Sequence, residues 1–340
     1  MADPVLSIRD LTVEFVTDDG IVHAVSEVTY DLYPGETLGI VGESGSGKSV
    51  STMSLLGLIP RPPGRVVSGE ALFGGRDLLT MKTKDLRQIR GGPISIIFQD
   101  PLTSLNPVLR VGQQLTEAIE THGTAKDGAA RSRAIDLLAT VGIPNPEQRY
   151  DQYPHEFSGG MRQRAMIAMA IANEPKVLIA DEPTTALDVT IQAQILEVLK
   201  KARDETHAAT ILITHDLGLI AELADRVIVM YGGRIVEQGD VHTIFAAPRN
   251  PYTIGLMESL PRVTVDDDWL RPIPGQPPSM INMPPGCAFH PRCFLSQGRA
   301  RCREEVPELR PIEETAHLSR CHFAEELIGR GSKLHEVVET

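Results

Sequence analysis

The sequence predicts an α/β fold, built mainly on a parallel sheet with some antiparallel strands, followed by a small, irregular, cysteine-rich C-terminal extension. Three observations lead to this prediction. A glycine-rich loop at residues 42–49 joins an apolar strand to a helix, and strands alternate with helices up to about residue 245. Proline-rich sequence follows, and all four cysteines lie between residues 287 and 321. We therefore expect a domain boundary near residue 245.

The N-terminal segments alternate apolar and polar residues, which is typical of half-buried strands. Residues 6–15 and 21–32 are predicted to be antiparallel strands, joined by a turn at residues 18–20. A continuous apolar strand over residues 37–41 then enters the glycine-rich loop. Leucine and methionine content predicts a helix over residues 50–58. The chain therefore begins with strands and meets its first helix directly after the loop.

The later elements continue the alternation. Apolar residues at helical spacing predict helices, and short apolar runs predict strands. The predicted helices cover residues 111–142, 161–172 and 191–201, and the predicted strands cover residues 94–98, 177–180, 209–214 and 226–230. Two parallel strands need a crossover connection between them, which is usually a helix. Strands that alternate with helices are therefore expected to pair in parallel. This order predicts a mostly parallel sheet core.

Composition and charge limit the classes of function that the chain can have. The chain has 340 residues, 41% of them hydrophobic, and a formal net charge of −12. An acidic excess argues against a nucleic-acid partner held by general electrostatics, since phosphates require a basic face. The N-terminus lacks the features of a signal peptide, and no apolar run approaches the ~18 residues that a membrane span requires. We expect a cytoplasmic chain that acts at a membrane only through partner proteins.

Residues 42–49 form a phosphate-binding pattern. They are Gly42, Glu43, Ser44, Gly45, Ser46, Gly47, Lys48 and Ser49. The glycines allow successive backbone N–H groups to face an anion at the start of a helix. Lys48 adds a positive charge for the β- and γ-phosphates, and the Ser49 hydroxyl can ligate Mg²⁺. The alternative interpretation is a solvated loop, which the strand-loop-helix context disfavours.

Two adjacent carboxylates follow the apolar strand at residues 177–180. In parallel sheets, ligands bind at the carboxyl ends of such strands. Asp181 is placed to reach the Mg²⁺ shell, and Glu182 is the candidate that orients and activates an attacking water. The alternative interpretation is an acidic helix cap after a buried strand. The phosphate-binding pattern upstream favours the catalytic interpretation.

A second potential anion site opens the helix before this strand. Ser158 can cap that helix, and Gly159 and Gly160 permit a close approach of another molecule. Two copies of the fold facing head to tail would explain two such sites, because the serine-glycine turn of one would meet the γ-phosphate held by the other. The alternative interpretation is an ordinary capped helix.

In order, these motifs resemble the ATP-binding cassette (ABC) ATPases over residues 5–245. The shared order is the phosphate loop, Gln99, Ser158-Gly159-Gly160, Asp181-Glu182, Ala186-Leu187-Asp188 and His215. The resemblance implies a P-loop NTPase fold with an ATPase core at residues 1–98 and 166–245, a helical subdomain at residues 99–165, and the extension at residues 246–340. The signature differs from the usual Leu-Ser-Gly-Gly-Gln in having Phe157 and Met161 at its outer positions.

The resemblance also implies the roles of individual residues in binding and hydrolysing ATP. Phe15 resembles the aromatic platform for adenine, Gln99 the glutamine that joins Ser49 and Asp181 around Mg²⁺, and His215 the switch histidine on the γ-phosphate. The residues expected to contact ATP across a dimer, or to lie between its two sites, are Ser158, Gly159, Gly160, Gln163 and Asp188.

Finer features resemble the importer branch for oligopeptides and dipeptides. They are residues 99–107, residues 157–164, and residues 250–253 followed by the cysteines. This resemblance implies an ATPase subunit at the cytoplasmic face of the cell membrane. Its implied partners are a second, non-identical ATPase subunit, two transmembrane permease subunits and an extracytoplasmic substrate-binding protein.

The cargo and two other functions stay open. Relatives in this branch also move nickel, and nothing in a cassette touches the cargo, so peptide, nickel and other small solutes are all compatible with these residues. A soluble ABC ATPase acting on ribosomes or nucleic acid is disfavoured by the single cassette and the lack of sustained heptads. A redox or iron sensor is the third alternative.

Cys287, Cys293, Cys302 and Cys321 are separated by five, eight and eighteen residues. A reducing cytoplasm makes thiolate ligation a better explanation than disulfides. Zinc and an iron-sulfur cluster both accept four thiolates, although structural zinc sites usually contain Cys-x-x-Cys pairs, which are absent here. The nearby histidines that could substitute as ligands are His290, His317 and His322. The resemblance to peptide importers implies a 4Fe-4S cluster, with zinc as the alternative.

Overall fold

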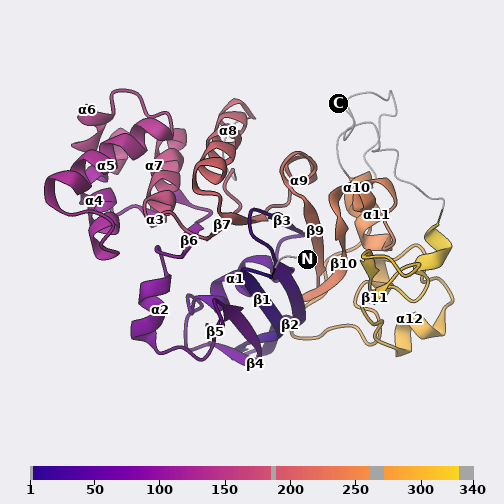
Figure 1. The fold of residues 1–340 in the computed structure, drawn as a ribbon. Coiled ribbons are helices and arrows are strands. Elements are labelled where there is room, and N and C mark those ends of the chain that lie inside the picture. Colours follow the sequence, from indigo (N-terminus) through magenta and orange to yellow (C-terminus); the bar gives the residue numbers. More distant parts are fainter. Residues whose placement is uncertain (1–2, 185–188, 260–271, 329–340) are drawn as a thin grey trace. The chain divides into compact units, whose positions relative to one another are not determined.

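The computed structural model describes residues 3–184, 189–259 and 272–328. The chain divides into two compact units, each assembled from separate stretches of sequence (Figure 1). Unit 1 comprises Met1–Leu6, Asp31–Glu36 and Phe73–Ile213, and unit 2 comprises Ser7–Tyr30, Thr37–Leu72 and Thr214–Thr340. The domain boundaries expected from composition and family resemblance remain predictions.

The sheet of unit 1 is parallel, as the sequence predicts. Strand β7 (Val177–Asp181) pairs with β6 (Ile94–Ile97) on one side and with β8 (Ala209–Ile213) on the other. Every residue of β7 and β8 is buried, which accounts for their continuous apolar sequence, since strands in parallel sheets are covered on both faces. The carboxyl ends of β6, β7 and β8 therefore lie at one edge.

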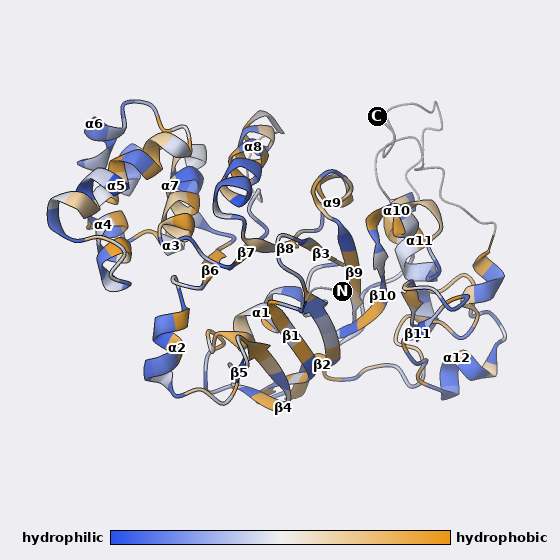
Figure 2. Ribbon diagram, viewed as in Figure 1, coloured by the Kyte–Doolittle hydropathy of each residue, from blue (hydrophilic) through white to orange (hydrophobic). Residues whose placement is uncertain are grey.

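Helices form most of the rest of unit 1. Helix α5 packs against α4, α6 and α7, and α7 also packs against α8 and β6. Figure 2 shows both apolar and polar residues on α4 and α5, and the buried residues of α4 are Val111, Gly112, Leu115 and Ile119. The elements are β5 (Arg76–Asp77), α2 (Thr83–Ile89), α3 (Pro101–Ser104), α4 (Val111–Thr121), α5 (Asp127–Thr140), α6 (Pro146–Tyr150), η1 (Pro154–Glu156), α7 (Gly159–Ile171) and α8 (Val189–Thr206).

The predicted helical stretch at residues 111–142 is two helices rather than one. Helix α4 ends at Thr121, and Gly123 follows with a φ of +72°. A positive φ cannot continue a right-handed helix, and glycine adopts it without strain. The break lets α5 turn back and pack against α4.

Unit 2 contains two groups of strands. Strands β2 (Gly20–Leu32), β1 (Leu6–Thr17) and β4 (Gly64–Phe73) lie side by side in that order. In the second group, β3 (Thr37–Val41) pairs in parallel with β9 (Arg226–Tyr231), which pairs antiparallel with β10 (Arg234–Asp240). Helix α1 (Lys48–Leu55) follows β3 after the glycine-rich loop. This arrangement confirms the mixed sheet that the sequence predicts.

The C-terminal part of unit 2 consists mostly of short elements, of which α10 and β12 pack against β10. Strand β12 (Leu318–Ser319) pairs antiparallel with β10, with Ser319 opposite Glu237. The remaining elements are α9 (Leu217–Leu223), α10 (Val241–Ala246), α11 (Pro251–Glu258), η2 (His290–Arg292), α12 (Ala300–Glu304), β11 (Arg310–Pro311) and η3 (Ala324–Leu327). Within the described ranges, no helix combines the length and the apolar character that crossing a bilayer requires.

Candidate functional site

The glycine-rich loop joins β3 to α1 in unit 2, and close backbone approaches require two of its glycines, Gly42 and Gly47. Gly42 has a φ of +152° and Gly47 a φ of +98°. A Cβ atom added to Gly42 would lie 2.2 Å from the carbonyl oxygen of Met230, and one added to Gly47 would lie 2.3 Å from the carbonyl oxygen of Ala24. No side chain fits at either position, so the backbone itself lines the loop.

Polar groups are gathered inside this loop. Lys48, the first residue of α1, is only 5% exposed, and its Nζ donates to the carbonyl oxygens of Gly42 (2.7 Å) and Glu43 (3.0 Å). Ser46 is 4% exposed, and its hydroxyl has no hydrogen-bond partner among the described residues. A buried ammonium, an unpaired buried hydroxyl and a helix N-terminus together fit a phosphate group.

The two carboxylates lie in unit 1 at the end of β7. Asp181 is 2% exposed. Glu182 follows with a φ of +46°, and its N–H donates to the carbonyl of Ile213 in β8 (2.8 Å). A positive φ is uncommon for a residue other than glycine, and it persists where the surroundings impose it, frequently at active sites. The backbone therefore holds Glu182 in a defined position at the carboxyl edge of the sheet.

Gln99 is brought next to Glu182, a contact that the sequence did not predict. Its Nε2 donates to Oε2 of Glu182 over 3.1 Å. Gln99 follows β6, and β6 pairs in parallel with β7, so both side chains start from the same edge of the sheet. The expected role of Gln99 around Mg²⁺, beside Ser49 and Asp181, stays a prediction.

The start of α7 is capped as the sequence predicts. Ser158 is exposed, and its hydroxyl accepts a hydrogen bond from the N–H of Met161 (3.3 Å). Gly160 is buried, and a Cβ atom there would lie 2.9 Å from Ile191. Gln163 is only 1% exposed. The expected contacts of Ser158, Gly159, Gly160 and Gln163 with ATP across a dimer stay predictions.

Two further predicted residues belong to unit 2, and one lies outside the described residues. His215 is exposed, and the preceding Thr214 donates from its N–H to the carbonyl of Ile40 in β3 (3.2 Å). Phe15 is half-buried in β1. Asp188 lies outside the described residues. The expected roles of all three remain predictions.

The four cysteines line one cavity in unit 2 of about 330 Å³, including its open mouth. His290 and His322 also border it. The N–H of Cys287 donates to the carbonyl of Cys302 (2.9 Å). Burial raises the pKa of the Cys293 thiol to about 11 and that of Cys321 to about 12. The clustering expected from the sequence is therefore present, and His317 is not part of it.

His317 is bonded elsewhere, which removes it from the candidate ligands. Its ring lies 2.7 Å from Oε1 of Glu237, and both side chains are buried. Within the described residues, no group of three or more His, Cys, Asp or Glu side chains is arranged to hold a metal ion. Neither the zinc nor the 4Fe-4S prediction is supported by such a group.

Sequence reasoning missed two residues that contact the phosphate loop. The N–H of Glu43 donates to the hydroxyl of Tyr252 (2.8 Å), and the Glu43 carboxylate is paired with Arg292. The hydrogen bond from the Arg292 guanidinium to Glu43 raises the pKa of Arg292 above its ordinary value. Arg292 lies 249 positions away in the chain, and no local pattern signals such a contact.

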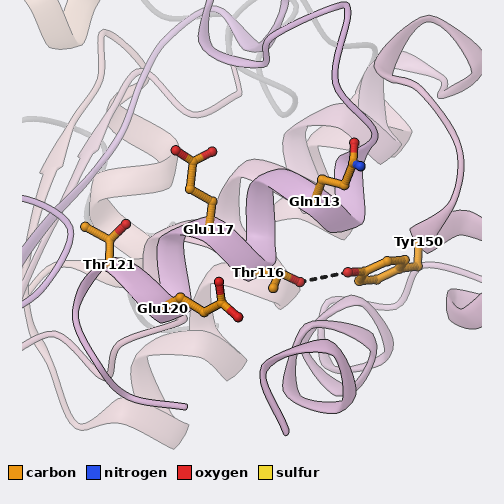
Figure 3. Close-up of a pocket in the computed structure, with 6 residues that line it drawn as sticks. All are labelled: Gln113, Thr116, Glu117, Glu120, Thr121 and Tyr150. Atoms are coloured by element: carbon orange, nitrogen blue, oxygen red, sulfur yellow. Dashed lines mark hydrogen bonds between the residues drawn. The ribbon is translucent and has the colours of Figure 1, made fainter. Parts of the chain in front are cut away.

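A separate hollow lies on the helices of unit 1. Figure 3 shows that it is bordered by side chains from α4 and by Tyr150, whose hydroxyl is 2.8 Å from that of Thr116. The residues around it are Gln113, Thr116, Glu117, Glu120, Thr121 and Tyr150. It contains none of the predicted site residues.

Two protein-family models match the chain. The one described as "ABC transporter" matches residues 25–185, and the one described as "Oligopeptide/dipeptide transporter, C-terminal region" matches residues 236–302. The second match includes Tyr252 and Arg292 as well as three of the four cysteines.

Curated relatives resemble the chain over most of its length. The dipeptide transport ATP-binding protein DppD of Bacillus subtilis strain 168 is 53% identical over 291 residues, which cover 86% of this chain and 87% of that protein. The oligopeptide transport ATP-binding protein OppD of the same organism is 54% identical, and the match covers 84% of this chain and 80% of that protein. DppD of Escherichia coli strain K12 is 49% identical, and the match covers 96% of this chain and 98% of that protein.

Solved structures with the same fold are also similar. A dimeric post-hydrolysis state of the ATP-binding cassette MJ0796, bound to ADP and Pi, superposes with a TM-score of 0.62 at 26% identity and covers 69% of this chain and 98% of that chain. For cbiO1 from Clostridium perfringens, the TM-score is 0.59 at 30% identity, and the superposition covers 72% of this chain and 91% of that chain.

Proposed function

This chain belongs to the ABC transporter family, and we propose that it hydrolyses ATP as a subunit of an importer for oligopeptides or dipeptides. The phosphate loop with its buried Lys48 supports the ATPase activity. The match of residues 236–302 to the C-terminal region of oligopeptide and dipeptide transporters carries the proposal about the cargo. The DppD and OppD relatives, which are named for peptide transport, support the same cargo.

Within the proposed ATP site, each residue has a separate role in phosphoryl transfer. Residues 42–49 bind the phosphates, and Lys48 neutralises charge on the β- and γ-phosphates. Glu182 orients the attacking water and accepts its proton, and His215 contacts the γ-phosphate. Phe15 stacks on the adenine. Positioning and charge neutralisation are most of what this reaction requires from a protein.

Mg²⁺ would be held by oxygen ligands that the chain provides. We assign Ser49, Asp181 and Gln99 to it, because hydroxyl, carboxylate and amide oxygens are the ligands that Mg²⁺ prefers. The buried Asp181 at the end of β7 fits this assignment, since a carboxylate there is better accommodated with a cation nearby. When bound, the ion neutralises phosphate charge.

We further propose that each ATP is bound between two cassettes. Ser158, Gly159, Gly160 and Gln163 of one subunit would contact the nucleotide held by the other, with Asp188 between the two sites. The exposed, capped start of α7 supports this role for Ser158. A structural neighbour is described as a dimer with bound ADP and Pi, which is consistent with such an arrangement.

The proposed assembly contains a second, non-identical ATPase subunit, two transmembrane permease subunits and an extracytoplasmic substrate-binding protein. This chain would lie at the cytoplasmic face of the membrane, held there by the permeases. The names of the relatives support a transport complex of this kind. The importer proposal gives no role to nucleic acid.

For the cysteine cavity we propose a 4Fe-4S cluster on Cys287, Cys293, Cys302 and Cys321. A single zinc ion requires four sulfur atoms about 2.3 Å from one point, whereas a four-iron cluster spans more space. Four thiols around one cavity therefore fit a cluster better than an ion. Bound there, it would act as a structural staple for a segment of short elements.

Peptide uptake tests the proposed function. Cells that lack this chain should fail to take up a labelled dipeptide or short oligopeptide, and the wild-type chain should restore uptake. Lys48→Ala should not restore it, because nucleotide binding is lost. Labelled nickel ions, supplied in parallel, test the alternative cargo. Restored nickel uptake without peptide uptake would overturn the assignment of the cargo.

A further inference from the structure

Glu43, the second residue of the phosphate loop, is held by two side chains from distant parts of unit 2. Its N–H donates to the hydroxyl of Tyr252 over 2.8 Å. Its carboxylate accepts two hydrogen bonds from Arg292, from Nη1 to Oε2 (2.7 Å) and from Nη2 to Oε1 (3.0 Å). Both the main chain and the side chain of this loop residue are therefore fixed from outside the loop.

Arg292 is itself firmly placed. Its side chain is only 5% exposed, and its Nε donates to the carbonyl of Pro274 over 2.9 Å. The guanidinium lies 5.9 Å from the ring centres of both Tyr231 and Phe289. A buried charge is tolerated when it is paired and hydrogen-bonded. Glu43 supplies the countercharge, so the pair holds together two segments far apart in sequence.

The same part of the loop also places the lysine ammonium. Lys48 Nζ donates to the carbonyl oxygens of Gly42 and Glu43. If the main chain at Glu43 shifts, the ammonium and the neighbouring N–H groups shift with it. Affinity for a phosphate depends on how well these donors are positioned in advance. The position of Glu43 therefore bears directly on nucleotide binding.

We propose that Arg292, from the C-terminal extension, is a positioning residue for the ATP site. It holds Glu43 so that the phosphate loop keeps the shape that receives the triphosphate. This inference rests on the proposed ATP site and adds a residue that lies outside its motifs. Because Arg292 directly precedes Cys293, it also ties the segment that carries the cysteine cavity to the phosphate loop.

The test measures the dissociation constant of Mg-ATP for the full-length chain at equilibrium. Arg292→Ala should raise it about tenfold, because a charge-assisted bidentate pair is lost. Arg292→Lys keeps the charge but not the planar fork, so its effect should be intermediate. Glu43→Gln removes the same ion pair from the side of the loop. The double variant should bind about as weakly as Arg292→Ala alone, since both changes break one interaction.

Two further measurements separate positioning from general stability. In ATP hydrolysis, Arg292→Ala should raise KM while kcat stays within about twofold, since binding rather than chemistry is weakened. Arg299→Ala is the matched control: it breaks a bidentate pair with Glu326 (2.7 and 2.8 Å) in the same extension. It should leave the dissociation constant of ATP unchanged.

The results of these measurements distinguish failure of the inference about Arg292 from failure of the proposed ATP site. The inference is overturned if folded Arg292→Ala binds ATP as tightly as the wild type, or if the effects of Arg292→Ala and Glu43→Gln multiply. Should Arg292→Ala fail to fold, wild-type affinity in both Glu43→Gln and Arg292→Lys would overturn it equally. If Lys48→Ala also bound ATP normally, the proposed ATP site would fail rather than this added residue.

Discussion

The amide of Gln99 donates to Oε2 of Glu182 over 3.1 Å and joins the ends of two neighbouring parallel strands. Glu182 has a positive φ, so its backbone and its side chain are both constrained. An orienting hydrogen bond on a carboxylate fixes the direction in which that group accepts a proton. Gln99 therefore positions the residue that we propose as the activator of water.

Glu182→Gln should abolish hydrolysis while ATP still binds. The phosphate loop is untouched, but an amide cannot accept the proton of the attacking water, so turnover should fall at least about 100-fold. Steady-state phosphate release and equilibrium ATP binding measure the two effects. Glu197→Gln, at an exposed position on α8, is the control and should behave as the wild type. Normal turnover in Glu182→Gln would remove this residue from the mechanism.

Ser158 variants separate helix capping from contact with ATP. Ser158→Ala removes the hydroxyl that accepts from Met161 N–H and should lower the free energy of unfolding by about 1 kcal/mol. Ser158→Asn can cap the helix equally well and should keep wild-type stability. Both variants should lose hydrolysis if the hydroxyl contacts ATP across a dimer. Full hydrolysis in folded Ser158→Asn would reduce Ser158 to a helix cap.

Alanine at Gly42 should be much more harmful than alanine at Gly45. Both glycines have a positive φ, but a Cβ at Gly42 would lie 2.2 Å from the carbonyl oxygen of Met230, whereas one at Gly45 meets no heavy atom within 4 Å. We expect Gly42→Ala to lower the free energy of unfolding by roughly 1–3 kcal/mol more than Gly45→Ala. Urea unfolding measures the difference, and equal losses would contradict the close packing of the loop.

The metal content of the extension can be measured directly. Anaerobically purified protein should be brown and contain iron and sulfide in equal amounts, as a 4Fe-4S cluster requires. Cys321→Ser should lower the iron content and the unfolding temperature together, because one ligand of the proposed staple is lost. Colourless protein with one bound zinc ion per chain would contradict the cluster.

Local sequence was sufficient to predict many of the elements. Strand β3 has the predicted bounds, and β6, β7 and β8 differ from the prediction by one residue, because continuous apolar runs mark strands buried on both faces. Strand β4 was not predicted. Its residues 67–70 are all exposed, so the alternation of buried and exposed residues on which such a prediction depends is missing.

The α/β class and the phosphate loop could be predicted from neighbouring residues, because strand and helix periods and the need for glycine are local properties. Which distant side chains meet depends on the tertiary packing. Gln99 reaches Glu182 because β6 pairs with β7. Arg292 reaches Glu43, 249 positions earlier in the chain, because the segment around Arg292 packs against the loop. Such contacts depend on how whole elements pack, which short-range patterns do not encode.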